Sequence, residues 1–554
     1  MASRVARVLY MILNLRKVPD TKNQTTCPGS GPAGRTCLSA SVIRMIQKSL
    51  KPETFKEAMY LYLDRHKYRT ATPNDLWKAF DDAMMKTNDL NPWLNMSNFM
   101  SGWTNTRGYP VVSAKSEEHA IILSQKNFFT PEIFEEFWIP ITMTTASKLN
   151  FSVTTADIWL QGFPITIPYN SQEEWFILNI QQSGYYRVNY DTKSWNRLIN
   201  ALKSANHTLI HVTNRAQIID DLLNLARADW ITYGLALNGT TYLLKEQDYI
   251  PWKAFFSGMN FLLQRYQGNH GESMLKEYIR LLAADRFEKL DFEDNNEEEF
   301  RMDQLNKDLI LSWMCKLNHT ECVDKSIHLF AKWRGNDTYT ISSNARTAVY
   351  CTAIRSGSLA EWEFLWDQYL KTDFASEKKV ILEALGCSMD KEVLNSYIEH
   401  ALTYNYTSNI RKQDVSTVLA SVYNSGKFGV DVMLDYLVNN YEKIYNFYED
   451  WDGVEELISK LASHISVKDQ ITKLNELSIK VGNITNIVVS IKAANTSASS
   501  NLQWYRNHSS VINDWLSEII PVMRDANPAP TVVANNLSII SMTVFSLIAY
   551  IMSQ

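Results

Sequence analysis

The chain has 554 residues, of which 45% are hydrophobic and 21% are charged. A chain of this length and composition can bury several hydrophobic cores, so we expect about three domains, and global disorder is excluded. The net charge of -5 gives no reason to expect a nucleic-acid partner.

The N-terminal 38 residues carry no strong structural signal. Met1 to Leu15 place Arg4 and Arg7 before a short apolar run, but no clear small-residue cleavage site follows, so a secretory signal is only weakly indicated. We expect residues 1–38 to be a divergent and poorly ordered N-terminus.

Residues 39–104 have the pattern of short amphipathic helices. Apolar side chains between Ala40 and Leu63 recur at helical spacing, and Thr72 followed by Pro73 is typical of a cap that opens a third helix. These helices are polar on one side and need a larger body to pack on, so they look like the end of a larger domain.

The hydrophobic period changes after Trp103. Short β-branched and aromatic segments, separated by Pro, Gly, Asn and Ser, predict five or six strands in a small β-sandwich over residues 105–193. The predicted strands are Tyr109–Ala114, Ala120–Phe129, Trp138–Thr145, Phe163–Ile167, Glu174–Leu178 and Tyr185–Tyr190.

A helical pattern is clearest in the stretch Asn214–Arg227. Its apolar residues fall on one side, whereas Asp220 and Asn224 share the opposite side, as in an amphipathic helix. Asn214 with Gln217 three residues later resembles a capping box that opens this helix.

Helical segments continue to about residue 520. Helix starts near Val323, Leu359, Glu392 and Val430 are spaced about 32 to 38 residues apart and alternate with second helices. Antiparallel helix pairs at this interval predict a large α-solenoid of the HEAT or armadillo type over residues 194–524.

Cysteine content and glycosylation sequons bear on the cellular compartment. Six cysteines are too few for a disulfide scaffold, whereas twelve Asn-x-Ser/Thr sequons exceed the number expected by chance and favour a secreted or lumenal chain. The sequons begin at Asn23, Asn95, Asn150, Asn206, Asn238, Asn318, Asn336, Asn405, Asn483, Asn495, Asn507 and Asn536. Those from Asn95 to Asn507 are the predicted glycosylation sites.

The C-terminal segment 525–554 has the order of a glycolipid-anchor signal. Asp525–Asn527 precede a polar spacer that contains proline, and an uncharged apolar run from Ser538 to Met552 follows. We expect lipid attachment near Asp525 and a location on the extracellular face of the plasma membrane. A short membrane span and a buried helix are the alternatives, although a run of about fifteen apolar residues is marginal for a span.

The chain carries no catalytic signature of its own. None of its ten histidines belongs to a His-Glu-x-x-His pattern, and no Gly-x-Ser-x-Gly elbow, phosphate-binding glycine loop or dinucleotide fingerprint is present. His207 and His211 are four residues apart, but no acidic third ligand accompanies them. We therefore predict no catalytic and no metal-binding residue in this chain.

Five stretches carry a family resemblance: Gly102–Val112, Phe137–Thr142, Gly184–Asp191, Asn214–Arg227 and Leu244–Trp252. In this order and at this spacing they resemble the C-terminal half of aminopeptidase N-type zinc metalloaminopeptidases, which follows the catalytic residues of that family. The resemblance covers roughly residues 39–520. It implies a multidomain, mainly α fold, in which the C-terminal helices of a thermolysin-like catalytic domain precede the β-sandwich and the α-solenoid.

The resemblance transfers no catalytic residue. In that family, a His-Glu-x-x-His helix and a downstream Glu hold zinc, a Gly-x-Met-Glu-Asn stretch binds the substrate amine, and a Tyr in a Tyr-x-Lys-Gly-Ala-x-Val pattern stabilises the oxyanion. The first two stretches would lie before residue 1, and the third aligns with Thr36–Val42, where Thr36 occupies the tyrosine position. Without zinc ligands, no cofactor is expected in this chain, and peptide hydrolysis by this chain alone is not expected.

The resemblance also implies two disulfides in the helical part. By the family pattern, Cys315 pairs with Cys322 and Cys351 pairs with Cys387. Four unpaired thiols in the cytosol are the alternative.

Two functional hypotheses follow. In the first, the chain is the accessory C-terminal part of a membrane-anchored zinc metalloaminopeptidase, and its solenoid limits which peptides reach the active site. In the second, it is a non-enzymatic, glycolipid-anchored surface protein that binds ligands through the solenoid. Peptides, as the substrates of the family, and the membrane are the expected partners, and a homodimer is a candidate assembly. The abrupt departure at residues 1–38 favours a truncated transcript or gene model over a catalytically inactive relative.

Overall fold

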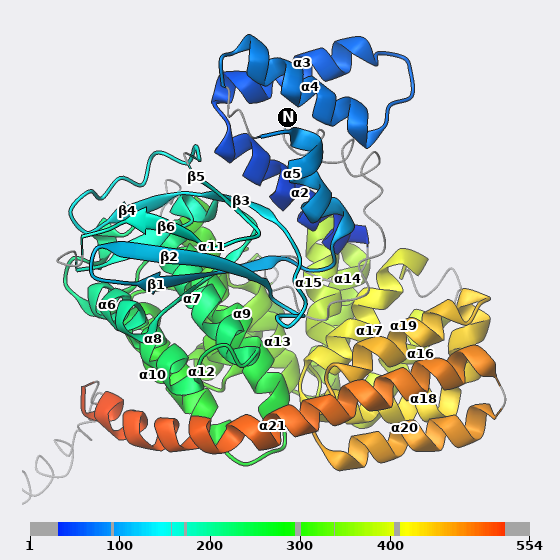
Figure 1. Cartoon of the computed structure of the whole chain (residues 1–554). Coiled ribbons are helices and arrows are strands. Elements are labelled where there is room, and N and C mark those ends of the chain that lie inside the picture. Colours follow the sequence, from blue (N-terminus) through cyan, green and yellow to red (C-terminus); the bar gives the residue numbers. More distant parts are fainter. Residues whose placement is uncertain are drawn as a thin grey trace, which may run out of the picture.

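The computed structural model describes residues 32–526 apart from 90–93, 157, 171–173, 294–300, 337, 404–409 and 483. Within these residues the chain is mainly helical, and three small sheets lie between an N-terminal group of helices and a long run of further helices (Figure 1). The mainly α class predicted from the sequence is confirmed.

The N-terminal helices lie at the top of Figure 1. They are α2 (Pro32–Ser49), α3 (Pro52–Arg65), α4 (Pro73–Lys86) and α5 (Met96–Asn105). As predicted, α4 begins after Thr72, whose side chain accepts a hydrogen bond from the Asp75 amide while the Asp75 carboxylate accepts one from the Thr72 amide. This capping box satisfies two amides that have no partner within the helix.

The largest sheet places the starts of two strands beside the end of a third. The strands are β1 (Pro110–Ser116), β2 (Ala120–Asn127), β3 (Trp138–Ile141), β4 (Met143–Thr145), β5 (Ile158–Gln161), β6 (Ile165–Pro168), β7 (Phe176–Leu178) and β8 (Arg187–Tyr190). The largest sheet has the order β6-β2-β1-β8, and β3 pairs with β5 and β4 with β7. Because β1 runs antiparallel to β2 and parallel to β8, Val111 lies beside both Lys126 and Arg187.

The strand predictions are close to the observed strands, with two differences. The predicted strand Trp138–Thr145 is divided into β3 and β4 at Thr142, because the Thr142 hydroxyl and carbonyl accept hydrogen bonds from the Ile180 and Asn179 amides instead of continuing one ladder. Strand β5 is absent from the predictions, because its four residues are too short to show an alternating pattern.

The helices from residue 192 onward form the largest part of the chain. They are α6 (Thr192–Lys203), α7 (Val212–Arg227), α8 (Tyr233–Thr240), α9 (Tyr249–Tyr266), α10 (Glu272–Glu288), α11 (Arg301–Lys316), α12 (Thr320–Gly335), α13 (Arg346–Ser356), α14 (Leu359–Lys371), α15 (Ala375–Leu385), α16 (Lys391–Leu402), α17 (Val415–Asn424), α18 (Lys427–Tyr448), α19 (Asp452–Ala462), α20 (Lys468–Val481) and α21 (Thr485–Ala526), with short 3-10 helices η1 (Ile180–Gln182), η2 (His207–Leu209), η3 (Thr241–Lys245) and η4 (Lys412–Asp414).

Two packing patterns organise these helices. Helices α11, α13, α15 and α17 pack in succession, and α12, α14 and α16 each contact the odd-numbered helix that follows. Helix α21 crosses the bottom of Figure 1 and contacts α8, α9 and α10 as well as α19 and α20, so it connects the beginning and the end of the helical part. No helix in the described ranges combines the length and apolar character that crossing a bilayer requires.

The helix predicted at Asn214–Arg227 is present as α7, but its polar side is buried as well as its apolar side. Every residue from Asn214 to Ala226 is buried, since α8, α9, η1 and β8 all pack against this helix. The predicted capping box is wrong, because α7 begins at Val212 and the His211 side chain accepts a hydrogen bond from the Thr213 amide. Tertiary packing therefore covers the polar face that the sequence pattern would leave in water.

Both predicted disulfides are present. The bond between Cys315 and Cys322 closes the turn from α11 to α12, and the bond between Cys351 and Cys387 joins α13 to the turn after α15. The first disulfide therefore links α11 to α12, and the second links α13 to the end of α15.

The two disulfides should differ in their effect on stability. The Cys351→Ala/Cys387→Ala double variant opens a loop of sequence separation 36, whereas Cys315→Ala/Cys322→Ala opens one of separation 7. Chain entropy then predicts losses of about 4 and about 2 kcal/mol respectively in the free energy of unfolding. Guanidinium unfolding of the unreduced proteins measures both values, and an equal or reversed order would contradict the expectation.

Candidate functional site

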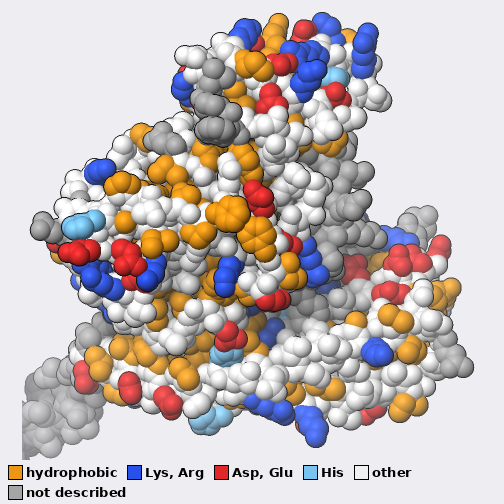
Figure 2. Space-filling model, in the orientation of Figure 1, with side chains coloured by type: hydrophobic (Ala, Val, Ile, Leu, Met, Phe, Trp, Pro, Cys, Tyr) orange, Lys and Arg blue, Asp and Glu red, His pale blue; other side chains and the backbone are white. Residues whose placement is uncertain are grey.

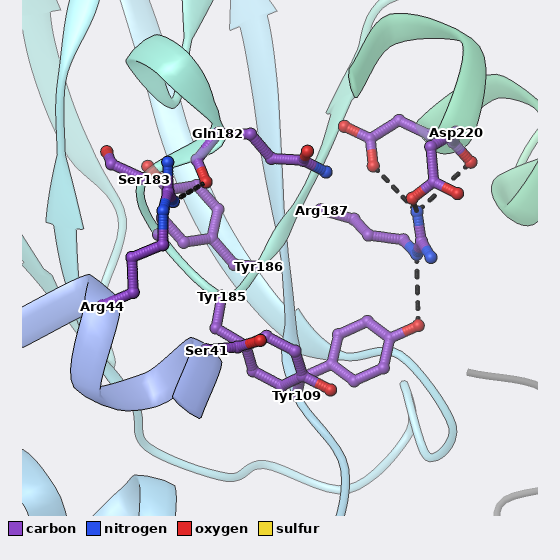
Figure 3. Close-up of a pocket in the computed structure, with 11 residues that line it drawn as sticks. Ser41, Arg44, Tyr109, Gln182, Ser183, Tyr185, Tyr186, Arg187 and Asp220 are labelled. Carbon is purple, nitrogen blue, oxygen red and sulfur yellow. Dashed lines mark hydrogen bonds and ion pairs between the residues drawn. The ribbon is translucent and has the colours of Figure 1, made fainter. Parts of the chain in front are cut away.

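The site lies where α2, the turn before β8, and α7 meet. A cavity of about 220 Å³ opens between them (Figure 3). Its walls are formed by Ser41, Arg44, Tyr109, Gln182, Ser183, Gly184, Tyr185, Tyr186, Arg187, Asp220 and Asp221. Charged side chains of both signs therefore surround a space that can hold several water molecules or a small polar group.

The turn that forms one wall has an unusual backbone. Asn179, Gln181 and Gln182 have positive φ angles of 61°, 54° and 49°, a region that residues other than glycine occupy rarely and at an energetic cost. The buried Asn179 side chain accepts a hydrogen bond from the Gly184 amide at 2.8 Å and donates one to the Gly184 carbonyl at 3.1 Å. These bonds hold the turn in its strained conformation.

Two further side chains reach this turn from other elements. Arg44 of α2 donates to the Gln182 carbonyl at 2.6 Å and to the Gln181 carbonyl at 3.1 Å (Figure 3). Asn214 of α7 accepts a hydrogen bond from the Gln181 amide at 2.8 Å and donates one to the Asn179 carbonyl at 3.0 Å. Burial lowers the pKa of Arg44, but a guanidinium stays charged at neutral pH. Helix α2 therefore contributes a positive charge to the wall.

A buried ion cluster forms the opposite wall, with Arg187 of β8 at its centre (Figure 3). Its Nη1 lies 2.7 Å from Asp220 Oδ2 and 3.1 Å from Asp221 Oδ1, and its Nε donates to the Tyr109 hydroxyl at 3.1 Å. Arg187 is only 7% exposed and Asp221 only 2%. Burial acts to lower the pKa of Arg187, but Asp220, Tyr109 and Asp221 raise it well above its ordinary value, so the guanidinium stays charged.

Asp221 has a charge that depends on pH near neutrality. Burial raises its pKa to about 7, while Arg187 opposes this shift and Asp220 adds to it. Its carboxylate also accepts hydrogen bonds from the Val188 amide at 3.1 Å and from the Gln217 side chain at 3.3 Å. One guanidinium thus faces two carboxyl groups, and Asp221 takes up a proton as the pH falls through about 7.

A second ion cluster fixes the N-terminal half of α7. Arg215 binds Glu246 through two bonds of 2.7 and 3.1 Å, and its Nη2 lies 2.5 Å from Asp248 Oδ2. Its Nη1 donates to the Ile210 carbonyl at 2.7 Å. Because Arg215 and Glu246 are almost fully buried, this bidentate pair is rigid as well as charge-balanced.

The arrangement holds α2, β8 and α7 together through buried hydrogen bonds and ion pairs. In the part of the chain that the structure describes, no three His, Cys, Asp or Glu side chains come together in a way that could hold a metal ion. His207 packs against Tyr242, whereas His211 packs against Phe151 and caps α7. The described residues therefore offer no donor set that fits the zinc of the resembled family.

The predicted modification sites lie away from the cavity. Asn95, Asn150, Asn206, Asn318, Asn336 and Asn507 are exposed, Asn238 and Asn495 are half-buried, and Asn405 and Asn483 lie outside the described residues. Thr36 lies in α2, and Asp525 is exposed in the last turn of α21. None of these residues belongs to the cavity wall.

Sequence reasoning missed the pairing of Arg187 with Asp220 and Asp221. The polar pattern of α7 places Asp220 on a solvated face, whereas the structure buries it against β8. A usable signal exists, because Arg187 stands alone between apolar neighbours and two consecutive acids interrupt an apolar run. Isolated charges of opposite sign in two buried segments indicate a buried ion pair.

Comparison with known proteins identifies two matching regions. The family model for the ERAP1-like C-terminal domain matches residues 175–481, and that for the Peptidase family M1 domain matches residues 37–103. Aminopeptidase N of Plutella xylostella is 30% identical over 490 residues, which cover 86% of this chain and 51% of that protein.

Other relatives give a similar picture. Human aminopeptidase N is 28% identical over 494 residues, covering 86% of this chain and 50% of that protein. Membrane alanyl aminopeptidase of Manduca sexta is 31% identical over 414 residues, covering 73% of this chain and 41% of that protein. The chain spans about half the length, or less, of the curated relatives it matches.

Replacing the central arginine should expose the pH dependence of the cluster. Arg187→Met leaves two carboxyl groups buried without their cation, so we expect a loss of about 3 to 5 kcal/mol in the free energy of unfolding at pH 8. A carboxyl group whose pKa is raised in the folded state contributes to the stability of the folded protein at low pH. This contribution is lost as the pH rises through about 7. The deficit should therefore be smaller at pH 5.5.

Denaturant unfolding of wild type and variant at both pH values measures this difference. Arg506→Met, at an exposed position on α21, is the matched control and should change stability little. A loss of stability of the same size at pH 5.5 and pH 8 would contradict the proposed titration of Asp221.

Proposed function

Because the chain belongs to the aminopeptidase N-type family of M1 peptidases, we propose that it acts as the C-terminal, non-catalytic part of a membrane-anchored zinc aminopeptidase that removes N-terminal residues from peptides. The observation that carries this proposal is the order of the two matches. Residues 37–103 resemble part of a peptidase domain, and residues 175–481 resemble the domain that follows it.

Each part of the chain has a proposed role in such an enzyme. Residues 39–104 supply the last helices of the catalytic domain, residues 105–193 form the β-sandwich, and residues 194–524 form a solenoid that limits which peptides reach the active site. The succession of α11, α13, α15 and α17 supports the solenoid, and the separate sheets support a β domain.

The strained turn and the Arg187 ion cluster, which we call the joint, are proposed to make this scaffold rigid. Arg44 binds α2 to the strained turn, and Arg187 binds β8 to α7. Both contacts are buried or partly buried, so solvent screens them weakly. In the proposed enzyme the joint sets the position of the helical part relative to the helices that follow the catalytic residues.

In this proposal the chain does not itself supply the zinc chemistry of the family. Bound zinc provides a Lewis acid and an activated water molecule, but the described residues bring no suitable donors together. Thr36 stands at the position of the tyrosine that stabilises the oxyanion, and its hydroxyl differs in reach and acidity from a phenol. We therefore assign no step of peptide hydrolysis to this chain.

The proposed location is the extracellular face of the plasma membrane, with a glycolipid attached near Asp525. Six exposed sequons and two disulfides support an oxidising compartment outside the cytosol. Residues 527–554, which contain the apolar part of the proposed anchor signal, lie outside the described residues.

The purified chain should neither retain zinc nor cleave aminoacyl substrates. Elemental analysis is expected to give well under one zinc per chain, and alanine p-nitroanilide should not be hydrolysed above the rate in buffer. Retention of one zinc together with hydrolysis would overturn the proposal. Sequencing the 5′ end of the messenger RNA distinguishes the two hypotheses, because an in-frame His-Glu-x-x-His upstream favours the enzyme and its absence favours a binding protein.

Glycosylation and anchoring should be visible on the protein expressed in animal cells. Peptide N-glycosidase is expected to lower its mass by several glycans, because at least six predicted sites are exposed. A phosphatidylinositol-specific phospholipase should release the protein from the cell surface. Surface protein that resists the phospholipase would contradict the anchor, and light scattering of the released protein tests the candidate homodimer.

A further inference from the structure

The cavity beside the strained turn carries, at one end, a positive charge that no described carboxylate balances. Arg44 of α2 is half-buried in the cavity wall, and its guanidinium donates to the Gln182 and Gln181 carbonyls at 2.6 and 3.1 Å. Burial lowers the pKa of Arg44, and no carboxylate in the described part of the chain acts on it. Because a carbonyl group has no net charge, the full charge of the guanidinium remains in the wall.

The same end of the cavity has further hydrogen-bond donors. A guanidinium has five N–H donors in a planar fork that matches the geometry of a carboxylate. The bonds from Arg44 to the turn use two of these donors. Ser41 precedes Arg44 by three residues on the same face of α2, and its hydroxyl group also belongs to the wall. This end of the cavity is therefore suited to a carboxylate group.

The other end of the cavity carries an excess of carboxyl groups. Asp220 and Asp221 lie across the cavity from Arg44, and both share the single guanidinium of Arg187, at 2.7 and 3.1 Å (Figure 3). Since burial raises the pKa of Asp221 to about 7, these three groups together carry one negative charge above that pH. Asp221 Oδ1 accepts a hydrogen bond from Arg187, and a carboxylate oxygen can accept a second one.

The neighbouring Arg227 does not balance this negative charge. It lies on α7 outside the cavity wall, and its guanidinium stacks on the Phe261 ring at 3.9 Å. Burial lowers the pKa of Arg227 to about 10, and two tyrosines and Arg187 also act on it, but neither carboxyl group of the ion cluster does. The cavity thus has a positive end and a negative end.

The cavity has the size of a small molecule and is accessible from one side. Its volume of about 220 Å³ corresponds to about seven water molecules at about 30 Å³ each. Ser41 and Arg44 are partly exposed to solvent, whereas Asp220 and Asp221 are only 6% and 2% exposed. A small ligand can therefore enter at the positive end and reach the buried carboxyl groups with its leading part.

We propose that this cavity binds a free α-amino acid, with the carboxylate of the ligand at Arg44 and its ammonium group at Asp220 and Asp221. Such a zwitterion supplies, in a molecule of few atoms, the opposite charge that each end of the wall lacks. A ligand with one of these charges would leave the other end of the wall unbalanced, which lowers affinity. The inference goes beyond the proposed function and does not rest on it, because the ligand follows from the charges of the wall.

The charged groups of the wall are fixed before a ligand arrives. The turn that holds Arg44 is bound from α7 by Asn214, which accepts from the Gln181 amide at 2.8 Å. The Asp221 carboxylate accepts from the Val188 amide at 3.1 Å and from the side chain of a neighbouring glutamine at 3.3 Å. Groups that are already held in place lose little conformational entropy when a ligand binds.

Isothermal titration calorimetry of the full chain at pH 8, where Asp221 is ionised, tests the proposal. The probes are L-alanine, isobutyrate, in which a methyl group replaces the ammonium group, and isopropylamine, in which a methyl group replaces the carboxylate. We expect L-alanine to bind with a Kd of about 1 mM or below, and each of the other probes to bind at least about tenfold more weakly. All three probes have nearly the same size, so the comparison isolates the two charges.

Two variants test whether L-alanine binds in this cavity. Arg44→Met removes the positive charge, and Ser41→Leu fills part of the space while Arg44 stays in place. Each variant is expected to weaken the binding of L-alanine at least about tenfold. Arg506→Met, at an exposed position on α21, is the matched control and should leave the Kd unchanged.

Three results would overturn the proposal. They are no binding of L-alanine up to about 50 mM, binding of isobutyrate or isopropylamine as tight as that of L-alanine, and binding of L-alanine that both cavity variants leave unchanged. If Arg44→Met melts at a lower temperature because the turn loses a partner, Ser41→Leu decides where the ligand binds. Zinc and peptide hydrolysis play no part in these measurements, so their outcome is independent of the enzyme assay.

Discussion

A buried arginine that needs two carboxyl groups constrains the centre of this chain. Removing Arg187 from water costs several kcal/mol, and this cost is offset only while Asp220, Asp221 and Tyr109 stay within hydrogen-bonding distance. These partners lie on α7 and immediately before β1, so the Arg187 side chain ties β8 to α7 and to the segment that leads into β1. A small shift of any of them would leave a buried charge without its partner.

The strained turn before β8 extends this constraint to the N-terminal helices. Arg44 reaches the turn from α2, and Asn214 reaches it from α7. The conformation at Gln181 and Gln182 is unfavourable by itself, so it persists only because both sides bind it. In this way α2, the strained turn, β8 and α7 are held together as one unit.

Local signals in the sequence were reliable where the interaction itself is local. The cap at Thr72 could be predicted because its partner is Asp75, three residues away. Most strands could be predicted from alternation, and the disulfide pairs followed from family resemblance and are present. The joint could not be predicted, because Arg187 and Asp220 are 33 residues apart and no local pattern encodes their contact.

The sequence by itself determined the mainly helical class, the change from strands to helices, and the absence of a His-Glu-x-x-His pattern. These features depend on residue types and on their spacing along the chain, and both can be read directly from the sequence. Only the tertiary structure decided which polar residues are buried, because burial depends on what packs against them. The polar face of α7 became an interior surface for this reason.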